Sequence, residues 1–276
     1  MDEPLLHYDI HGSSGPYLLL VHGMLSSRAQ WLANISALSS FCRPVVVELL
    51  GHGRSPSPED PAPYSPQGYV EAFERLRQAL GVDRWLVCGQ SLGAALTLRY
   101  ALDHPGRVIA QVFTNSMSAL ASPGWSDYVR PLMQAQAERL EREGRRAIEN
   151  HPLNPSRGSR LPAAVRDALV EDCRLHDLRG VAFTGLYTVP ESSVRDRIAS
   201  NFVPSLLIVG EREERFREYR LFAEEHMPHL TIAGFDAGHA VNAEVADAFN
   251  RALEDFLRPF VDGAPAIRAA EGRRDG

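Results

Sequence analysis

The sequence predicts an α/β protein in which a mostly parallel sheet is flanked by helices and carries a helical insertion. Short aliphatic runs of strand length alternate with segments whose apolar residues recur at helical spacing. Within the short runs apolar residues follow one another without a polar partner, which is typical of strands buried on both faces. A single long stretch lacks such runs and interrupts the alternation.

The predicted strands are short and rich in valine, leucine and isoleucine. They cover residues 17–21, 45–49, 85–88, 108–113, 206–209 and 230–233. Helical stripes lie between most of them, and near the C-terminus Val245, Phe249, Ala252 and Phe256 form one more. Because parallel strands end at one edge of the sheet, functional residues are expected at the carboxyl ends of these runs.

The stretch without strand-like runs covers residues 118–201 and is rich in Arg, Glu and Ala. We predict a helical cap here, set into a core formed by residues 1–117 and 202–261. A proline-rich patch at 150–162 is expected to separate two helical parts of the cap. An insertion at the carboxyl ends of strands is expected to cover the crevice. Residues 262–276 are predicted to form a disordered tail.

Composition narrows the classes of function. The chain has 276 residues, 44% of them apolar, and a formal net charge of −6, so no broad basic field favours nucleic acid or an anionic membrane. No apolar run is long enough for a membrane span or signal peptide, so we expect a cytoplasmic protein. The three cysteines show no disulfide or zinc spacing. A small-molecule acyl substrate, no cofactor, and a monomer or homodimer are expected.

The pentapeptide Gly89-Gln90-Ser91-Leu92-Gly93 carries the main chemical prediction. It directly follows the strand at 85–88 and opens a helix of small residues, which is the context of a nucleophile elbow. In such a turn a bulky residue at Gly89 or Gly93 would clash with the adjacent strand and helix. We therefore predict Ser91 as the nucleophile.

A serine hydroxyl needs a base to remove its proton, and a carboxylate to orient that base. His239 follows the last predicted strand next to a glycine and is the predicted base. Glu213 follows the strand at 206–209 and is the predicted acid, with Glu214 as its rival. His226 and His229 flank a proline that removes a shared helix face, so no metal site is predicted.

Two backbone N–H groups are predicted to stabilise an oxyanion. One belongs to Leu92, the residue after the nucleophile, and the other to Met24, which follows a His-Gly pair at the end of an early strand. Substrate contacts are predicted for Gln90, Leu25 and Trp125.

These motifs together resemble the α/β-hydrolase superfamily, which implies its fold and a Ser-His-acid triad. Locally, residues 49–55 and 210–216 resemble the MenH-like family of succinyl-hydroxycyclohexadiene carboxylate synthases. In that family an aspartate stands where this chain has Glu213, and the elbow commonly ends in an arginine where this chain has Ala95. Arginines of the insertion such as Arg130, Arg160 and Arg174 are candidates to replace that cation, but they are expected on solvated helix faces.

The predicted function is hydrolysis of a small-molecule ester, thioester or lactone through an acyl-enzyme on Ser91. A MenH-like lyase that eliminates pyruvate is one alternative, and a carbon–carbon bond hydrolase is another. A ligand receptor built on a hydrolase shell is an alternative of a different class. The missing arginine beside the serine favours the hydrolase, because a substrate with several carboxylates would lose a cation there.

Overall fold

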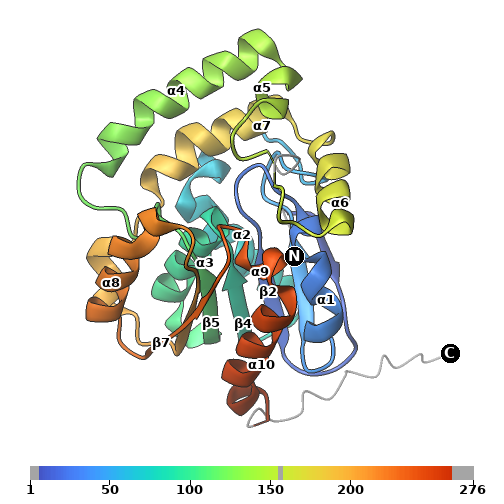
Figure 1. The fold of residues 1–276 in the computed structure, drawn as a ribbon, viewed down its shortest axis with the longest axis vertical. Coiled ribbons are helices and arrows are strands. Elements are labelled where there is room, and N and C mark those ends of the chain that lie inside the picture. The colour runs from blue at the N-terminus through green and yellow to red at the C-terminus, as the bar shows by residue number, and fades with distance from the viewer. Residues whose placement is uncertain (1–5, 155–157, 263–276) are drawn as a thin grey trace, which may run out of the picture.

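A computed structural model describes residues 6–154 and 158–262 of the chain and arranges its strands in one seven-stranded sheet (Figure 1). The strand order is β1-β3-β2-β4-β5-β6-β7; β1 runs antiparallel to β3, and every other pair is parallel. The strands are β1 (Tyr8–Ile10), β2 (Tyr17–Val21), β3 (Arg43–Val47), β4 (Trp85–Gly89), β5 (Val108–Thr114), β6 (Ser205–Gly210) and β7 (Leu230–Phe235). The predicted fold class is thereby confirmed.

All six predicted strands are present, but one is shifted and one strand was missed. β3 begins at Arg43 and ends at Val47, because the chain leaves the sheet at Glu48 while the apolar run continues into a buried loop. The missed strand β1 has three residues and contains Asp9, so it carries no apolar run. Its pairing with β3 at the sheet edge, with Tyr8 opposite Val47, makes it a strand.

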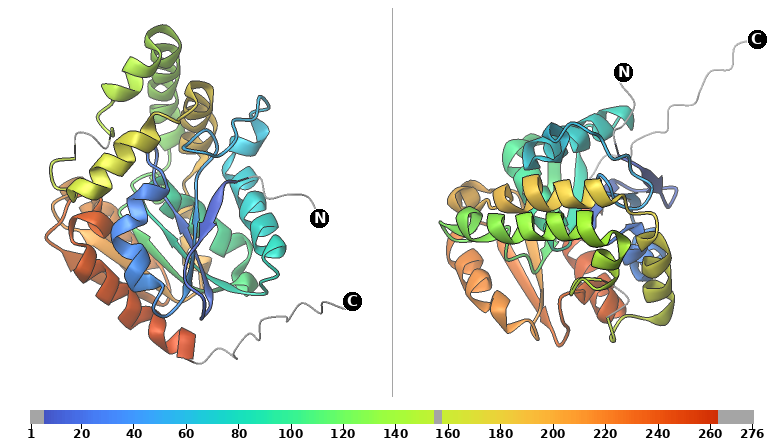
Figure 2. Two further views of the ribbon diagram at one scale, coloured as in Figure 1. Left: turned by 90° about the vertical axis from the view of Figure 1, so that its right-hand side faces the viewer. Right: turned by 90° about the horizontal axis from the view of Figure 1, so that it is seen from above.

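Helices cover both faces of the sheet (Figure 2). Along β2, Leu18 and Leu20 pack with α1 and α10, whereas Leu19 and Val21 pack with α2 and α3 on the other face. Burial on both sides explains why the strand sequences are continuously apolar. The helices of the core are α1 (Leu32–Leu38), α2 (Pro66–Ala79), α3 (Leu92–Asp103), α8 (Arg217–His226), α9 (Val241–Glu244) and α10 (Ala246–Asp262).

The described part of the segment between β5 and β6 contains helices and connecting loops and no strand. It contains α4 (Trp125–Glu143), α5 (Arg145–Glu149), α6 (Ala163–Cys173) and α7 (Leu178–Phe183), followed by a π-turn at Thr184–Thr188. α4 is the outermost of these helices, with α7 between it and the core, while α6 reaches down beside α1 (Figure 1). Within the described ranges, none of the helices combines the length and the apolar character that a membrane crossing requires.

Two predicted features are described only in part. The proline-rich patch does lie between two helices, α5 and α6, but its residues 155–157 are not described. The predicted tail is described only at Asp262, which ends α10, and residues 263–276 lie outside.

The turn from β4 into α3 packs directly on the end of β2. A Cβ atom at Gly93 would lie 2.2 Å from the carbonyl oxygen of Val21, and one at Gly89 would lie 2.3 Å from that of Gly93. Real Cβ atoms do not approach backbone oxygens this closely, so the predicted need for glycine at both positions is confirmed. The first turn of α3 is thereby pinned against the neighbouring strand.

Substituting Gly93 by alanine is expected to lower the free energy of unfolding by about 1–3 kcal/mol, because the added methyl overpacks the contact with β2. Gly106→Ala is the control, since no atom lies within 4 Å of the Cβ position there. Urea unfolding of both variants checks the prediction. Equal stability of the two variants would contradict it.

Candidate active site

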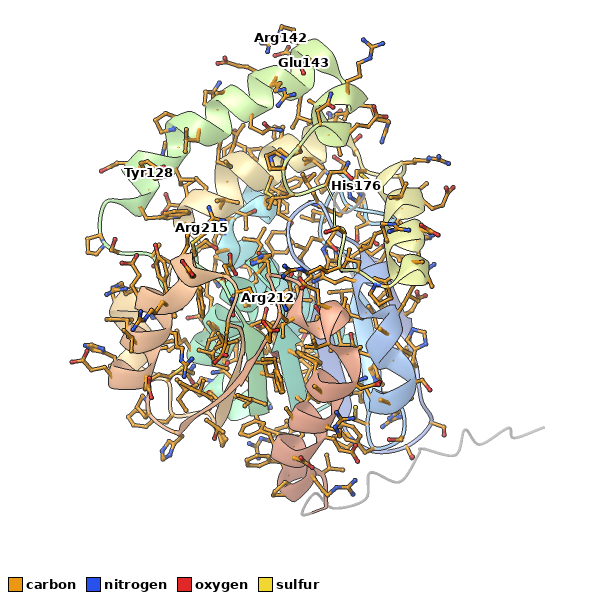
Figure 3. The ribbon with its side chains drawn as sticks, in the orientation of Figure 1. Tyr128, Arg142, Glu143, His176, Arg212 and Arg215 are labelled. Carbon is orange, nitrogen blue, oxygen red and sulfur yellow. The ribbon has the colours of Figure 1, made fainter. Side chains whose placement is uncertain are left out.

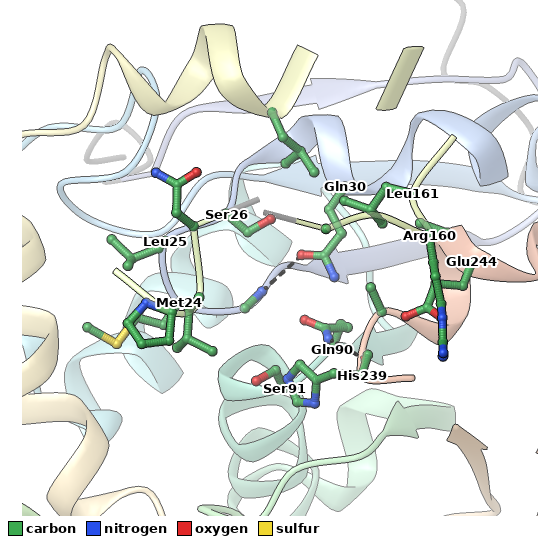
Figure 4. A pocket seen from close by; sticks show the side chains of 18 of the residues that line it. Met24, Leu25, Ser26, Gln30, Gln90, Ser91, Arg160, Leu161, His239 and Glu244 are labelled. Atoms are coloured by element: carbon green, nitrogen blue, oxygen red, sulfur yellow. Dashed lines mark hydrogen bonds and ion pairs between the residues drawn. The ribbon is translucent and has the colours of Figure 1, made fainter. Parts of the chain in front are cut away.

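Ser91 occupies the turn between β4 and α3 with an unusual backbone. Its φ of 53° and ψ of −117° are sparsely populated for a residue with a side chain, so the turn is strained. The strand, the tight turn and the glycine contacts hold this conformation in place. The hydroxyl of Ser91 faces a cavity at the carboxyl edge of the sheet (Figure 4).

His239 and Glu213 come from the loops that follow β7 and β6, and a hydrogen bond joins their side chains. His239 Nδ1 donates to Glu213 Oε2 over 2.8 Å, which leaves Nε2 of the neutral ring as an acceptor. The two loops meet because Gly210 and Gly238 touch: a Cβ at Gly210 would lie 1.9 Å from the Gly238 carbonyl oxygen. Glu214 has no hydrogen bond to His239 within the described chain.

Asn115, at the end of β5, fixes the Glu213 carboxylate. Its amide donates to Glu213 Oε2 over 2.9 Å and to the Gly210 carbonyl over 3.0 Å, while its oxygen accepts from the Gly210 N–H. Burial raises the pKa of Glu213, but the hydrogen bonds from His239 and Asn115 outweigh burial and bring that pKa below its ordinary value. Glu213 is therefore ionised at neutral pH. The sequence offered one hint, since Asn115 follows a strand at the same edge.

The cavity has a volume of about 330 Å³ and opens beside α6. Its wall is mostly apolar, with Met24 and Leu25 from the loop after β2 and with Leu161 and Leu169 from the insertion. Ser91 and His239 both line it, yet no hydrogen bond joins them in the described structure. Such contacts are commonly long before a substrate is bound.

The loop after β2 leaves one backbone N–H of a cavity-lining residue without an acceptor among the described residues. The N–H of Gly23 donates to Gln30 Oε1, as Figure 4 shows, and that of Leu25 donates to His52 Nε2 over 3.1 Å. Between them, the N–H of Met24 has no acceptor among residues 6–154 and 158–262, and the same is true of Leu92 at the start of α3. Leu25 itself is held at a φ of 57°.

Three buried histidines, His22, His52 and His176, lie together behind this loop. The ring of His52 lies 5.5 Å from that of His22 and 5.0 Å from that of His176, measured between centroids. Each ring accepts a backbone N–H, from Leu49 at His22, from Leu25 at His52 and from Gly53 at His176. Figure 3 places His176 between the insertion and the core. Only neutral rings can accept these bonds.

Burial is the main reason that these rings stay neutral. It lowers the pKa of His52 to about 4. For His22, burial and the neighbouring His52 lower the pKa to about 3, and for His176 burial and the other two rings lower it to about 2.

A charged network ties α6 to the same loop. Asp172, buried on α6, accepts from the hydroxyl of Ser27 over 2.8 Å and from Arg54 Nη1 over 3.0 Å. Arg54 in turn lies 3.4 Å from the fully buried carboxylate of Glu48, whose Oε2 also accepts the Arg54 N–H. The insertion is thereby connected to the core through a buried acid on each side of one arginine.

Not all the residues predicted at the site are brought together. Gln90 and Leu25 line the cavity, and the Gln90 amide also donates to the His239 carbonyl over 3.0 Å. Trp125 lies elsewhere, in a depression at the base of α4, where its indole N–H donates to Val189. Arg130 and Arg174 pair with acids on the surface, whereas Arg160 is on no helix and lines the cavity. The sequence offered Arg160 as one of several candidate cations, and nothing in it placed the residue at the cavity.

Metal-ligating side chains do not gather at this site or elsewhere in the described ranges. Residues 6–154 and 158–262 contain no group of three or more His, Cys, Asp or Glu side chains placed to hold a metal ion. The chemistry available at the cavity is that of the hydroxyl, imidazole, carboxylate and backbone groups that line it or support it.

A parallel sheet with a strained serine turn at its carboxyl edge, and a histidine–carboxylate pair nearby, defines a class of hydrolase-fold proteins. The chain belongs to the α/β hydrolase fold family, which it matches over residues 16–244. The resemblance inferred from the sequence motifs is thereby confirmed.

Curated relatives and solved structures of different activities share this fold. The chain is 26% identical to a putative 2-succinyl-6-hydroxy-2,4-cyclohexadiene-1-carboxylate synthase of Bacillus subtilis, over 87% of this chain and 89% of the relative. It is 28% identical to the putative carbamate hydrolase RutD of Agrobacterium fabrum, over 92% and 98%. MenH from S. aureus superimposes with a TM-score of 0.81 at 18% identity, over 92% and 98%. An enol-lactonase from Burkholderia xenovorans superimposes with a TM-score of 0.77 at 22% sequence identity, over 92% of this chain and 96% of the enol-lactonase.

The buried histidines predict a loss of stability in weak acid. Their folded pKa values lie below the ordinary 6.5, so the unfolded chain binds protons first as the pH falls. Their contribution to stability is complete above pH 6.5 and is lost as the pH falls from there toward 4. Each ring adds a slope of about 1.4 kcal/mol per pH unit to the free energy of unfolding.

Urea unfolding between pH 7.5 and 5 checks this slope. His176→Asn keeps an acceptor for the Gly53 N–H and removes a titrating ring, so its slope is expected to fall by about one proton. His226→Asn, at an exposed position on α8, is the control and is expected to keep the wild-type slope. An unchanged slope in His176→Asn would overturn the prediction.

Proposed function

We propose that this protein is a serine hydrolase that cleaves a small-molecule ester, thioester or lactone through an acyl-enzyme on Ser91. The observation that carries the proposal is the strained Ser91 at the wall of the cavity, beside a histidine already oriented by an ionised carboxylate. Strain of this kind persists where the surrounding structure serves a function. The cavity volume suits a small substrate.

In the proposed acylation step, Ser91 Oγ adds to the substrate carbonyl carbon while its proton passes to His239 Nε2. The imidazolium then returns this proton to the leaving alcohol or thiol as the carbon–oxygen or carbon–sulfur bond breaks. Glu213 stabilises the imidazolium through its hydrogen bond to Nδ1. In deacylation, water takes the place of the alcohol, and the same groups release the acid and restore the serine.

The free N–H groups of Met24 and Leu92 are proposed to hold the oxyanion. The Ser26 N–H closes a turn on the Gly23 carbonyl, and the N–H groups on either side of Met24 have acceptors, so Met24 supplies the donor that is left over. Leu92 adds a second donor at the N-terminus of α3, where the helix dipole favours negative charge. Preformed donors of this type stabilise the tetrahedral intermediate more than the planar substrate.

The segment at 118–201 is proposed to act as the cap of this site. Two of its parts line the cavity, namely α6 through Leu169 and the connection before α6 through Leu161. Apolar side chains there exclude water from the acyl group, which strengthens the electrostatic contacts at the carbonyl.

A fluorophosphonate probe is expected to label the wild-type protein at Ser91, as found by mass spectrometry of the tryptic peptide. Ser91→Ala is expected to lose the label and to lower esterase kcat/KM on a short-chain nitrophenyl ester by at least about 10³-fold. Ser26→Ala is the matched control, because Ser26 lines the same cavity away from His239. Full esterase activity in Ser91→Ala would rule out the proposal.

The identity of the acid is tested by comparing Glu213→Gln with Glu214→Gln. Glu213→Gln keeps the side-chain shape but removes the charge that stabilises the imidazolium, so kcat is expected to fall about 10²–10⁴-fold. Glu214→Gln changes an exposed carboxylate and is expected to stay within about twofold of wild type. The reverse order of effects would reassign the acid.

A further inference from the structure

The cavity has a single arginine among its lining residues, in a mostly uncharged wall. Of the described side chains that line it, only Arg160 and Glu244 carry a formal charge, apart from the titratable His239. Arg160 belongs to the connection that leads into α6, and in Figure 4 it extends beside Glu244, on the side of His239 away from Ser91. Among the described lining residues, Arg160 is therefore the one guanidinium available to a substrate in this cavity.

The guanidinium of Arg160 lacks a hydrogen-bonded acceptor in the described chain. Its Nη1 is 4.0 Å from Glu244 Oε2, which is too long for a hydrogen bond, and that same oxygen accepts the Gly238 N–H over 2.9 Å. Asp236, another nearby acid, is held by two nitrogens of Arg212. Asp236 is thus engaged by Arg212, whereas Glu244 forms a long ion pair with Arg160 that leaves the N–H donors of the planar fork without a hydrogen-bonded acceptor.

Other arginines of the insertion differ in this respect. Arg130 Nη2 is 2.5 Å from Glu191 Oε1, and Arg174 Nη1 is 2.8 Å from Glu171 Oε2. Both lie outside the cavity wall. Arg160 combines the two properties that a recognition residue needs, since it lines the cavity and has donors to spare.

The surroundings of Arg160 favour a monoanion over a dianion. A carboxylate matches two N–H donors of one guanidinium, side by side. A phosphate monoester would bring a second negative charge close to the Glu244 carboxylate, and no second cation among the described residues of this wall offsets it. Arg212 and Arg215 line a neighbouring hollow with Arg160, outside this wall, and Arg212 is paired with Asp236.

We propose that Arg160 selects substrates that carry a carboxylate, which it binds at the edge of the cavity while the scissile carbonyl lies against Ser91. This inference rests on the proposed function, and it names the substrate class as carboxylated esters or lactones. Arg160 acts as a specificity-determining residue and takes no part in proton transfer.

Binding to the Ser91→Ala variant tests the inference without turnover. Calorimetry compares the monomethyl esters of succinate, glutarate and adipate with uncharged methyl esters of the same chain length. The preference for the charged partner, expressed as a ratio of Kd values, is expected to fall at least tenfold in Ser91→Ala/Arg160→Gln for the best-bound pair. Arg160→Lys keeps a positive charge but loses the planar fork of donors, so its preference is expected to lie between those of the Arg160 and Arg160→Gln proteins.

Arg166→Gln in the same background is the control, because Arg166 lies on the neighbouring helix α6 and does not line the cavity. It is expected to keep the preference. A preference that is absent in all three pairs, or unchanged by Arg160→Gln, or lost equally in Arg166→Gln, overturns the role of Arg160.

Hydrolysis of the same esters by the wild-type protein separates this inference from the proposed function. Turnover without a preference for charged esters would support the proposed hydrolase function and refute the proposed role of Arg160. Binding that depends on Arg160, together with no turnover and no probe labelling, would support the proposed role of Arg160 and refute the proposed hydrolase function.

Discussion

The contact between the backbone of Gly93 and the end of β2 is the constraint on which the rest of this site depends. It presses the first turn of α3 against the central sheet, so that the chain can leave β4 only through the strained conformation of Ser91. The same contact fixes the point at which β2 ends and the loop containing Met24 begins. The loop that contains Met24 and the turn that contains Ser91, which are far apart in sequence, are thereby held in a fixed position relative to each other.

Much of this arrangement could be predicted from the sequence because it depends on short sequence patterns at the ends of strands. The elbow, the His239 loop and the Glu213 position each follow a recognisable strand, and parallel strands deliver their ends to one edge. Asn115 and the buried rings of His52 and His176 could not be found this way. Their roles depend on burial and on partners that are distant in sequence. Whether a histidine in a loop is buried cannot be predicted from its neighbours in the sequence.

Local patterns also failed where proline interrupted them. Arg160 was expected on a solvated helix face; its side chain is exposed to solvent, but α6 begins only at Ala163, and the connection before it lines the cavity. β1 was missed for the opposite reason: it is a strand by virtue of its pairing with β3 and not of its own composition. The local sequence of these two short segments was therefore not enough to predict their structure.

The anchoring of α6 divides the insertion into parts of different freedom. Asp172 bonds to Ser27 and Arg54, and Val165 and Leu169 pack with Ala29 from the core, so α6 is structurally part of the wall beneath it. No residue of α4, the outermost helix, lines the cavity, although its Leu140 shares a buried cluster with Leu25 of the loop after β2. In evolutionary terms, α6 is under the same selection as the nucleophile, whereas the part of α4 before Leu140 is held less directly.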